Sequence, residues 1–339
     1  MKNEQGNLAA PFPWFGGKSG AVAKVWKAFG TVQNYVEPFA GSAAMLLGAP
    51  KGKRVETIND ADGHVANFWR AISQDPEAVA YHADWPVNET DLFARHSWLV
   101  RHKQELLDKL HGDPDYFDAK TAGWWVWGAC AWIGSGWCSG KGPWVHDGET
   151  LVYADATSRQ LPSMSSNGIN RKLPSMSDRG INLLDDDAGG GRTSLILDWF
   201  TELYERMRDV RVTCGDWSRV CKDSVTVGNG LTGVFLDPPY TKGAMDYAAG
   251  GCGGDLALDV QNWCIANGGN PLLRIVLCGH DGEHDALLAH GWEKRGWVAR
   301  IGYAKTEEAK ANSASETIWC SPHCVPEVVA QLDIFAMAD

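Results

Sequence analysis

Residues 31–62 follow the order of a strand, a glycine turn, a helix and a second strand, and this unit constrains the possible folds more than any other segment. Tyr35 lies in the first apolar segment, Gly41 supplies the turn, and the second segment, 54–58, leads to Asp60. A strand that is followed by a helix and another strand forms a βαβ unit, in which the two strands are parallel. The sequence therefore predicts an α/β protein.

The same alternation returns after residue 191. Further strands are predicted at 210–213, 233–236, 272–278, 297–303 and 316–320, with helices at 195–207 and 256–266. This spacing indicates a doubly wound, mainly parallel sheet, which binds ligands at the carboxyl ends of its strands. Asp60, Asp216 and Asp237 each follow a predicted strand, so we expect these carboxylates to face one crevice together with the Gly41 turn.

Between residues 76 and 191 the alternation stops. We therefore predict a catalytic domain, 1–75 together with 192–339, and an inserted region, 76–191, that is first helical and then rich in loops. The inserted region contains a twelve-residue repeat, because the segment 161–170 recurs almost unchanged as 173–182. Pro, Ser, Gly and Asn dominate both copies and favour loops. The repeat could be an arm that reads DNA or a surface hairpin left by a duplication.

Composition narrows the class of protein. Hydrophobic residues make up 44% and charged residues 22% of the chain, which is ordinary for a globular protein. No apolar run approaches the roughly 20 residues that span a bilayer, and residues 1–10 lack a signal pattern, so we expect a cytoplasmic protein without a membrane segment. A net charge of -11 argues against a protein that coats DNA, although a local basic face remains compatible with it.

The cysteines indicate neither disulfides nor a metal. Nine cysteines without paired spacing are typical of reduced thiols. Cys320, His323 and Cys324 lie close together, but zinc sites generally take four ligands from two pairs, and no second pair lies nearby in the sequence. We therefore expect no metal site.

The 17 tryptophans are unusually many and concentrate between residues 124 and 144. Trp124, Trp127 and Trp132 can share a helix face, and we interpret them as core residues. Trp137 lies between small residues in the segment 134–140, which predicts that it projects from a loop. There it could stack on a base or fill the hole that a flipped base leaves in DNA.

A rigid corner, Asp237-Pro238-Pro239-Tyr240, follows the apolar run 234–236. The two prolines fix two φ angles and remove two donors, which leaves the Asp237 carboxylate and the Pro238 carbonyl as acceptors. Tyr240 adds a ring for stacking. This combination suits the exocyclic amine of a nucleobase, although a simple strand-ending turn also explains the tetrapeptide.

The glycine turn predicts a second ligand. Gly41 and Ser42 open a helix after a strand, where a ligand can approach the backbone closely. Neither G-x-G-x-x-G nor a P-loop is present, which disfavours a pyrophosphate cofactor. Asp60 stands where a carboxylate commonly accepts hydrogen bonds from ribose hydroxyls. A nucleoside with a polar tail and no phosphates fits this crevice, and S-adenosylmethionine is such a molecule.

Three blocks of the sequence, in this order, resemble the Dam-type (D12 class) adenine-N6 DNA methyltransferases and their phage relatives. They are Pro13 to Lys18, Val36 to Ser42, and Asp237 to Tyr240. The resemblance implies a seven-stranded S-adenosylmethionine-dependent methyltransferase sheet, a double-stranded DNA substrate, and a phage or prophage source in a bacterial host. The inserted region is unlike the helical target-recognition region usual in the family.

The resemblance also implies roles for individual residues. Asp60 would hold the cofactor's ribose, and Asp216 its adenine. The complete set expected to bind the cofactor is Trp14, Gly17, Lys18, Glu37, Pro38, Phe39, Gly41, Ser42, Asp60, Asp216, Trp217 and Asp237. The catalytic set that would hold the target base is Asp237, Pro238, Pro239 and Tyr240. From the inserted region we expect DNA contacts by Trp137, Lys141, Arg171, Lys172 and Arg179.

The predicted reaction is methyl transfer from S-adenosylmethionine to N6 of a flipped adenine at a specific site in double-stranded DNA. Hydrogen bonds from N6 to Asp237 and to the Pro238 carbonyl would favour a more tetrahedral nitrogen, and alignment with the methyl group would add proximity. Cytosine-N4 methylation asks for the same acceptors and is the nearest alternative. A DNA-binding relative without catalysis is a third reading, disfavoured because the corner and the glycine turn are intact. The sequence does not indicate the oligomeric state.

Overall fold

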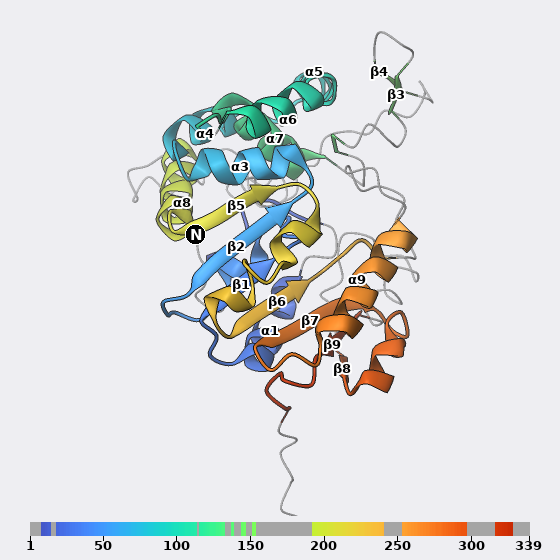
Figure 1. Cartoon of the computed structure of the whole chain (residues 1–339). Coiled ribbons are helices and arrows are strands. Elements are labelled where there is room, and N and C mark those ends of the chain that lie inside the picture. Colours follow the sequence, from blue (N-terminus) through green and yellow to red (C-terminus); the bar gives the residue numbers. More distant parts are fainter. Residues whose placement is uncertain are drawn as a thin grey trace, which may run out of the picture.

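The structure is a computed structural model that describes residues 8–14, 18–113, 115–132, 137–138, 144–146, 151–153, 192–240, 253–296 and 316–327. A twisted sheet forms its centre, and helices pack around it (Figure 1). Helices α3 to α7 gather beside the β5 edge of the sheet, whereas α9 lies in front of β7.

The central sheet has seven strands in the order β5-β2-β1-β6-β7-β9-β8. The bounds are β1 Asn34–Glu37, β2 Val55–Asp60, β5 Val210–Cys214, β6 Thr232–Leu236, β7 Leu273–His280, β8 Glu293–Gly296 and β9 Glu316–Cys320. All pairs from β5 to β7 are parallel, and β9 runs antiparallel to both β7 and β8. The expected seven-stranded, mainly parallel sheet is thus confirmed. The strand predicted at 297–303 lies outside the described residues, and β8 was not anticipated.

The first strand, β1, lies in the middle of the sheet and has parallel partners on both sides. Val36 aligns with Thr57 of β2 and with Val234 of β6. Every residue of β1 and of β6 is buried, as expected for parallel strands that are covered on both faces. Because these strands run in the same direction, the segments that follow them emerge at one edge.

Helices cover both faces of the sheet. Their bounds are η1 Lys18–Gly20, α1 Val22–Phe29, α2 Ala44–Leu47, α3 Gly63–Ile72, α4 Pro76–Ala83, α5 Glu89–Arg101, α6 Lys103–Gly112, α7 Ala119–Ala131, α8 Arg192–Met207, η4 Trp217–Cys221, η5 Val227–Asn229, α9 Gly253–Asn267 and η7 Asp285–His290. A separate antiparallel pair, β3 Trp144–His146 and β4 Leu151–Tyr153, completes the described elements. No helix in the described part of the chain is long and apolar enough to span a membrane.

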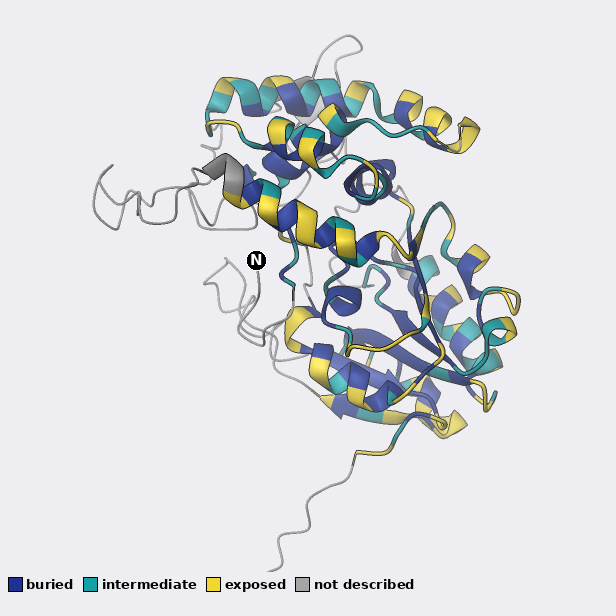
Figure 2. Cartoon of the chain, turned by 90° about the vertical axis from the view of Figure 1, so that its left-hand side faces the viewer, coloured by how far each residue is buried: buried dark blue, intermediate teal, exposed yellow. Residues whose placement is uncertain are grey.

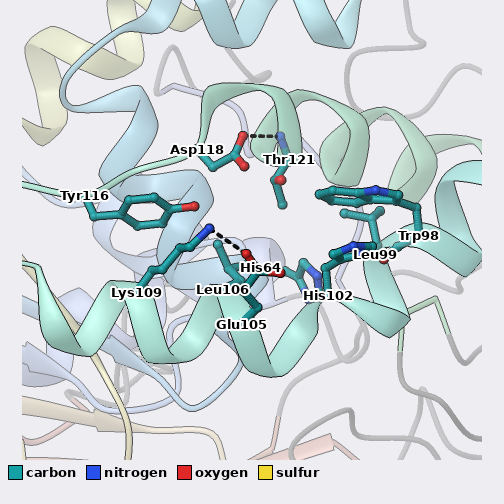
Figure 3. A pocket seen from close by; sticks show the side chains of 10 residues that line it. All are labelled: His64, Trp98, Leu99, His102, Glu105, Leu106, Lys109, Tyr116, Asp118 and Thr121. Carbon is teal, nitrogen blue, oxygen red and sulfur yellow. Dashed lines mark hydrogen bonds and ion pairs between the residues drawn. The ribbon is translucent and has the colours of Figure 1, made fainter.

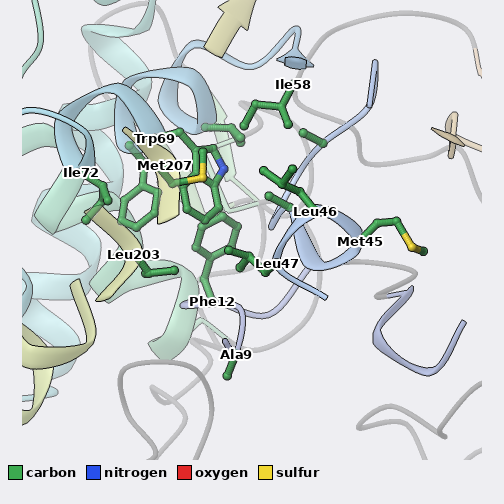
Figure 4. Close-up of a cluster of buried hydrophobic side chains, with 14 of the residues drawn as sticks. Ala9, Phe12, Met45, Leu46, Leu47, Ile58, Trp69, Ile72, Leu203 and Met207 are labelled. Carbon is green, nitrogen blue, oxygen red and sulfur yellow. The ribbon is translucent and has the colours of Figure 1, made fainter. Parts of the chain in front are cut away.

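Two hydrophobic clusters lie on opposite faces of the sheet, and alternation along β1 separates them. Tyr35 belongs to the larger cluster, which includes residues of α1, α3, α7 and α8, whereas Val36 belongs to the smaller one, with residues of α9 and η7. Figure 4 shows part of the larger cluster, where Phe12 and Trp69 lie close together. The outer helix faces are exposed and the sheet between them is buried (Figure 2).

The helices of the inserted region begin at side chains that cap them. Asp75 accepts a hydrogen bond from the Ala78 amide at the start of α4, Asn88 does the same for α5, and Asp118 for α7. Such caps satisfy amides that have no partner within the helix. The described residues of 76–131 are therefore mainly helical, and α4 and α7 pack on α8 and α3. The repeat at 161–182 lies outside the described residues.

The tryptophans of α7 and the one that follows it, Trp132, differ in how deeply they are buried. Trp127, which we expected in the core, is fully buried, and its neighbour Trp125 is too. Trp124 and Trp132 are half-buried. The eight cysteines in the described residues are free thiols.

Candidate active site

The carboxyl ends of β1, β2 and β6 bring together the acidic residues that the sequence singled out. Glu37 ends β1, Asp60 ends β2, and Asp237 directly follows β6. Since β1 pairs with both other strands in parallel, these carboxylates meet at one edge of the sheet. The Gly41 turn follows β1 at the same edge.

Lys18, Asp237, Tyr240 and Glu316 form a compact charged network at this edge. Lys18 Nζ lies 3.1 Å from Asp237 Oδ1 and 3.5 Å from Glu316 Oε2. The Tyr240 hydroxyl lies 3.2 Å from Asp237 Oδ1 and 3.0 Å from Glu316 Oε2. Lys18 Nζ also lies 5.0 Å from the centroid of the Tyr240 ring. The lysine thus connects the N-terminal segment to the corner after β6.

Burial and mutual attraction shift the ionisation of this network. Burial opposes the charge of Lys18, but Asp237 and Glu316 outweigh that effect, and the pKa of the lysine is raised. Burial raises the pKa of Asp237 although Lys18 lowers it in part. Burial and the nearby Asp237 carboxylate raise the pKa of Tyr240 well above its ordinary value. The network therefore keeps Lys18 charged and the Tyr240 hydroxyl protonated.

Glu37 is a buried carboxyl that is held from two sides. The Tyr35 hydroxyl donates to Glu37 Oε2 over 2.9 Å, and the Leu46 amide donates to the same oxygen over 3.2 Å. Burial raises the pKa of Glu37 to about 8, with a contribution from Asp237. The two hydrogen bonds hold the side chain at the start of the glycine turn.

The glycine turn requires residues without bulky side chains. Gly41 has a φ of 46° and Ala43 has a φ of 51°, both in the left-handed region. A Cβ at Gly41 would collide with the Trp14 indole. Trp69 Nε1 donates to the Gly41 carbonyl over 3.0 Å, so two tryptophans and a tight turn hold this segment against β2.

Asp60 supports the same turn and connects it to α3. Its Oδ2 accepts the Gly41 amide over 2.9 Å, and its Oδ1 accepts the Asp62 amide over 2.8 Å. Burial raises the pKa of Asp60 to about 6. Asp62 caps α3, and Lys103 Nζ of α6 lies 3.7 Å from its Oδ2. For Asp62, burial is outweighed by His64 and Lys103, and the pKa is lowered.

Three aromatic rings, those of Phe39, Trp217 and Trp263, pack together at the segments that follow β1 and β5 and on α9. The rings of Phe39 and Trp217 are stacked with centroids 6.0 Å apart and an interplanar angle of 28°. Trp263 meets Trp217 edge-on at 6.2 Å. Asp216 is exposed, and its Oδ1 accepts the Ser218 amide over 2.9 Å, so its side chain caps η4. Its predicted contact with an adenine ring would have to coexist with this capping bond.

The residues at this edge fit the chemistry of S-adenosylmethionine. The half-buried carboxyl of Asp60 suits ribose hydroxyls, and the Phe39–Trp217 pair suits a flat heterocycle. The carboxyls of Glu37 and Asp237 suit a cationic sulfonium and ammonium, because a cation bound beside them would favour their ionised forms. Pro38, Ser42 and Trp14 line the same turn, because Asn59 donates to the Pro38 carbonyl over 3.0 Å and Trp14 packs over Gly41.

Some predicted site residues lie elsewhere or cannot be placed. Gly17, Lys141, Arg171, Lys172 and Arg179 are outside the described residues. Glu316 belongs to the network, and sequence reasoning missed it. Its signal is the direction of β9: because that strand is antiparallel, its first residue reaches the edge where the other strands end.

The prediction that Trp137 projects from a loop is wrong. Its Nε1 donates to the Trp125 carbonyl over 3.1 Å, and its ring lies 5.3 Å from Trp132 and 5.2 Å from His96. The ring covers Gly128 of α7, where a Cβ would collide with it. Because Gly128 has no side chain, the Trp137 ring can pack directly against the backbone of α7.

A hollow of about 110 Å³ lies apart from the network, within the helical layer (Figure 3). Its walls come from α3, α5, α6 and α7 and the segment before α7, and they contain none of the four network residues. Its charged groups are already paired, since Lys109 contacts Glu105 at 2.6 Å and Asp118 accepts the Thr121 amide. The chemistry therefore belongs to the sheet edge and not to this hollow.

A comparison with protein-family models finds one similarity, in the N-terminal third of the chain. Residues 14–113 match the family model of the D12 class N6 adenine-specific DNA methyltransferases. The match includes Lys18, the Gly41 turn and Asp60, whereas Asp237, Tyr240 and Glu316 come from outside it. A search of curated proteins finds no match to the chain. The family match, the strand order and the acidic edge agree with one another: over residues 14–113 the chain is similar to the D12 class N6 adenine-specific DNA methyltransferases, and enzymes of this class use S-adenosylmethionine.

Proposed function

We propose that the corner from Asp237 to Tyr240 holds an adenine that has been turned out of double-stranded DNA at a specific site. The observation that carries this proposal is the contact of Lys18 with Asp237 beside the glycine turn. It locks an acceptor at the edge where the cofactor residues also lie. DNA is the substrate of the family, and N6 becomes accessible only when the base leaves the stack.

Asp237 and the Pro238 carbonyl accept the two N6 hydrogens in this proposal. Lys18 and Tyr240 both contact Asp237 Oδ1. We therefore propose that the other oxygen, Oδ2, accepts the hydrogen bond from the adenine. Two acceptors on the amine draw its hydrogens away from the ring plane and localise the nitrogen lone pair. When bound, S-adenosylmethionine supplies the electrophilic methyl group. The contribution of the chain is orientation and proximity.

Tyr240 offers its ring to the extruded base. Extrusion costs a few kcal/mol, and stacking on an aromatic face offsets about 1–3 kcal/mol of it. The His280 ring meets Tyr240 edge-on with centroids 4.7 Å apart, and the hydroxyl is held by two carboxylates. A ring held on both sides presents a fixed face to the base.

The cofactor lies along the glycine turn in this proposal. Asp60 accepts its ribose hydroxyls, Phe39 and Trp217 flank its adenine, and Glu37 faces its methionine part. Gly17, Pro38, Gly41, Ser42, Trp14 and Asp216 complete the set. Asp60 retains lone pairs for this task, since each of its oxygens accepts one backbone amide.

The segments 1–75 and 192–339 are proposed as the catalytic domain and 76–191 as the target-recognition region. The basic residues Lys141, Arg171, Lys172 and Arg179 stay proposed DNA contacts, whereas Trp137 is no longer proposed because its ring packs on α7. The similarity to phage relatives and the repeated segment support a phage or prophage source, and a DNA substrate favours the cytoplasm of a bacterial host. We propose that neither a metal nor a membrane takes part.

The decisive experiment replaces the corner carboxylate. Asp237→Asn keeps the shape but weakens the acceptor, and we expect turnover to fall about 10²- to 10³-fold while calorimetry shows retained cofactor binding. Asp259→Asn, an exposed carboxylate on α9, is the matched control and should leave turnover unchanged. Normal turnover in Asp237→Asn would remove this residue from the mechanism. Mass analysis of the nucleosides separates N6-methyladenine from N4-methylcytosine.

A further inference from the structure

Glu316 is a carboxylate at the active site to which the proposed methyl-transfer step assigns no role. It begins β9 and aligns with His280 of β7, so it lies at the edge where Asp237 leaves β6. Its side chain is 9% exposed, and it contacts both Lys18 and Tyr240. Two carboxylates, Asp237 and Glu316, thus share one lysine in this network. A position of this kind suggests a use in the reaction.

The hydrogen-bond count at Tyr240 points to that use. The phenol has one hydrogen, yet its oxygen lies within hydrogen-bond distance of both Asp237 Oδ1 and Glu316 Oε2. The hydroxyl can donate to only one of them at a time. When the other carboxyl carries a proton, that carboxyl can donate to the phenol oxygen, and both short contacts become hydrogen bonds. Both contacts of the Tyr240 oxygen can therefore be hydrogen bonds only when one of the two carboxyl groups, Asp237 or Glu316, carries a proton.

We propose that Glu316 receives, through Tyr240, the proton that the adenine N6 loses on methylation. The inference rests on the role of Asp237 given above. As the bond from N6 to the methyl carbon forms, the bond from sulfur to that carbon breaks and its electron pair stays on sulfur. The excess proton on N6 passes to Asp237. A half-turn of the protonated Asp237 carboxyl about its Cβ–Cγ bond brings that proton from Oδ2 to the Tyr240 oxygen, and the Tyr240 hydrogen moves to Glu316 Oε2, which leaves Asp237 ionised again.

Other groups around Glu316 are poorer acceptors. Lys18 is already protonated, because Asp237 and Glu316 outweigh its burial. Cys278 is a fully buried thiol on β7, and His280 turns its ring to the edge of Tyr240. Glu37 lies on β1, where it is bonded to Tyr35. A base seated on Asp237 would cover that carboxyl, whereas Glu316 lies beyond Tyr240. Glu316 acts through Tyr240 and is a positioning residue in this scheme.

The first test is Glu316→Gln, which keeps the size of the side chain but removes its capacity to accept a proton as a carboxylate. We expect the single-turnover rate of methyl transfer, with cofactor and DNA saturating, to fall about 10²-fold. Binding of S-adenosylmethionine and of DNA, measured by calorimetry and anisotropy, should be unchanged. Glu316→Asp should restore part of the rate. Glu293→Gln on β8, which is paired with Arg295, is the matched control and should behave as the wild type.

The second test asks whether Tyr240 and Glu316 act as one unit. Tyr240→Phe keeps the stacking face and removes the hydroxyl. We expect the double variant to be no slower than either single variant, because each interrupts the same proton path. The remaining activity of Glu316→Gln should rise with pH as solvent base replaces the carboxylate, whereas the wild-type rate should change less over the same range.

The outcomes separate this inference from the proposed function. A wild-type rate in Glu316→Gln, or rate losses that multiply in the double variant, would overturn the proton path. Weakened cofactor or DNA binding in Glu316→Gln without a lower saturated rate would overturn it too. If Glu316→Gln does not fold, Glu316→Asp and Tyr240→Phe carry the test, and full activity in Tyr240→Phe is contradictory. An active Asp237→Asn would instead overturn the proposed function.

Discussion

At the scale of single residues, the site consists mainly of carboxyl groups that lie against one lysine and a few hydroxyl and amide groups. Glu37, Asp60 and Asp237 all have raised pKa values, with burial as the main cause. Lys18 is the cation that faces Asp237 directly. The charges of Asp60 and Glu37 therefore change near pH 6 and pH 8, respectively.

Glu37 gives a prediction for stability. Its pKa is raised from 4.5 to about 8, so the folded protein holds this proton more tightly than the unfolded chain. This proton stabilises the folded state fully below pH 4.5, and the contribution is lost as the pH rises towards 8. The loss in the free energy of unfolding is about 1.4 kcal/mol for each unit of the pKa shift. In Glu37→Gln the free energy of unfolding should decline less over this window. Urea titrations across pH measure it, and identical declines in both proteins would contradict the assignment.

The residues of the site were largely predictable, and the exception has a clear cause. Lys18, Asp237 and Tyr240 follow from local patterns: a glycine-rich segment and a proline corner after an apolar run. Glu316 required knowledge of strand direction, because in a parallel strand its first residue would lie at the opposite edge of the sheet. Trp137 was misplaced because Gly128, which seats its ring, lies nine positions away and gives no local signal.

At the scale of elements, α7 shows how a missing side chain organises its neighbours. Alanine normally stabilises a helix by about 1 kcal/mol over glycine, but at Gly128 a Cβ collides with the Trp137 ring. We expect Gly128→Ala to lower the free energy of unfolding by about 1–3 kcal/mol. It should also expose Cys138, which is now 0% accessible, to thiol reagents. Mass mapping of labelled peptides checks this.

The compensating variant tests the cause. Gly128→Ala combined with Trp137→Leu removes the collision and retains the better helix former. Relative to Trp137→Leu alone, the double variant should be more stable. If Gly128→Ala destabilises equally in both backgrounds, the Trp137 ring is not the reason.

Helix α8 is fixed to the sheet by a nearly buried ion pair. Arg206 binds Glu56 of β2 through two nitrogens, at 2.6 and 2.9 Å, and its Nη2 also donates to the Leu46 carbonyl over 3.1 Å. Arg206→Ala leaves Glu56 with Arg54 as its nearest partner. We expect a loss of about 2 kcal/mol in urea unfolding, because a buried carboxylate loses half of its partners.

The matched control for Arg206 lies two residues further on the chain. Arg208 pairs with Glu205 at 3.4 Å, and both side chains are more than half exposed. Arg208→Ala should cost less than about 0.5 kcal/mol, since exposed ion pairs contribute little. Equal losses at the two positions would mean that Arg206 contributes no more than a surface charge.

Strand positions were predicted well where every residue of the strand is buried, as in β6 and β9. The predicted 316–320 matches β9 in full, and 233–236 lies within β6. β8 escaped prediction because Glu293–Gly296 contains three charged residues and no apolar one. The antiparallel direction of β9 is a tertiary property that no local pattern encodes.

At the scale of the whole molecule, one hydrophobic cluster runs from the sheet into the helical layer. Phe12 meets Trp125 of α7 at 4.8 Å, and Phe68 of α3 meets both Trp125 and Phe200 of α8, at 6.0 and 5.9 Å. Tyr35 of β1 belongs to the same cluster. The helices of 76–131 thus share their core with the catalytic sheet.

A shared core predicts unfolding in a single step. Heat capacity and tryptophan fluorescence should report the same midpoint, and saturating S-adenosylmethionine should raise that midpoint for both probes. A separate transition at lower temperature, with a midpoint that the cofactor does not change, would show that the helical layer unfolds on its own. Deleting residues 76–131 should leave an insoluble or unfolded protein, because it removes Trp125 from the centre of the cluster.

The reversed strand β9 has a consequence for synthesis of the chain. When a ribosome has released residues up to 240, Lys18, Asp237 and Tyr240 can already assemble at the growing sheet, but Glu316 is still to be translated. The last carboxylate of the network enters only after β7 has formed its place beside β6. If Glu316 completes the proton path, a nascent chain would bind its ligands before it could turn them over efficiently.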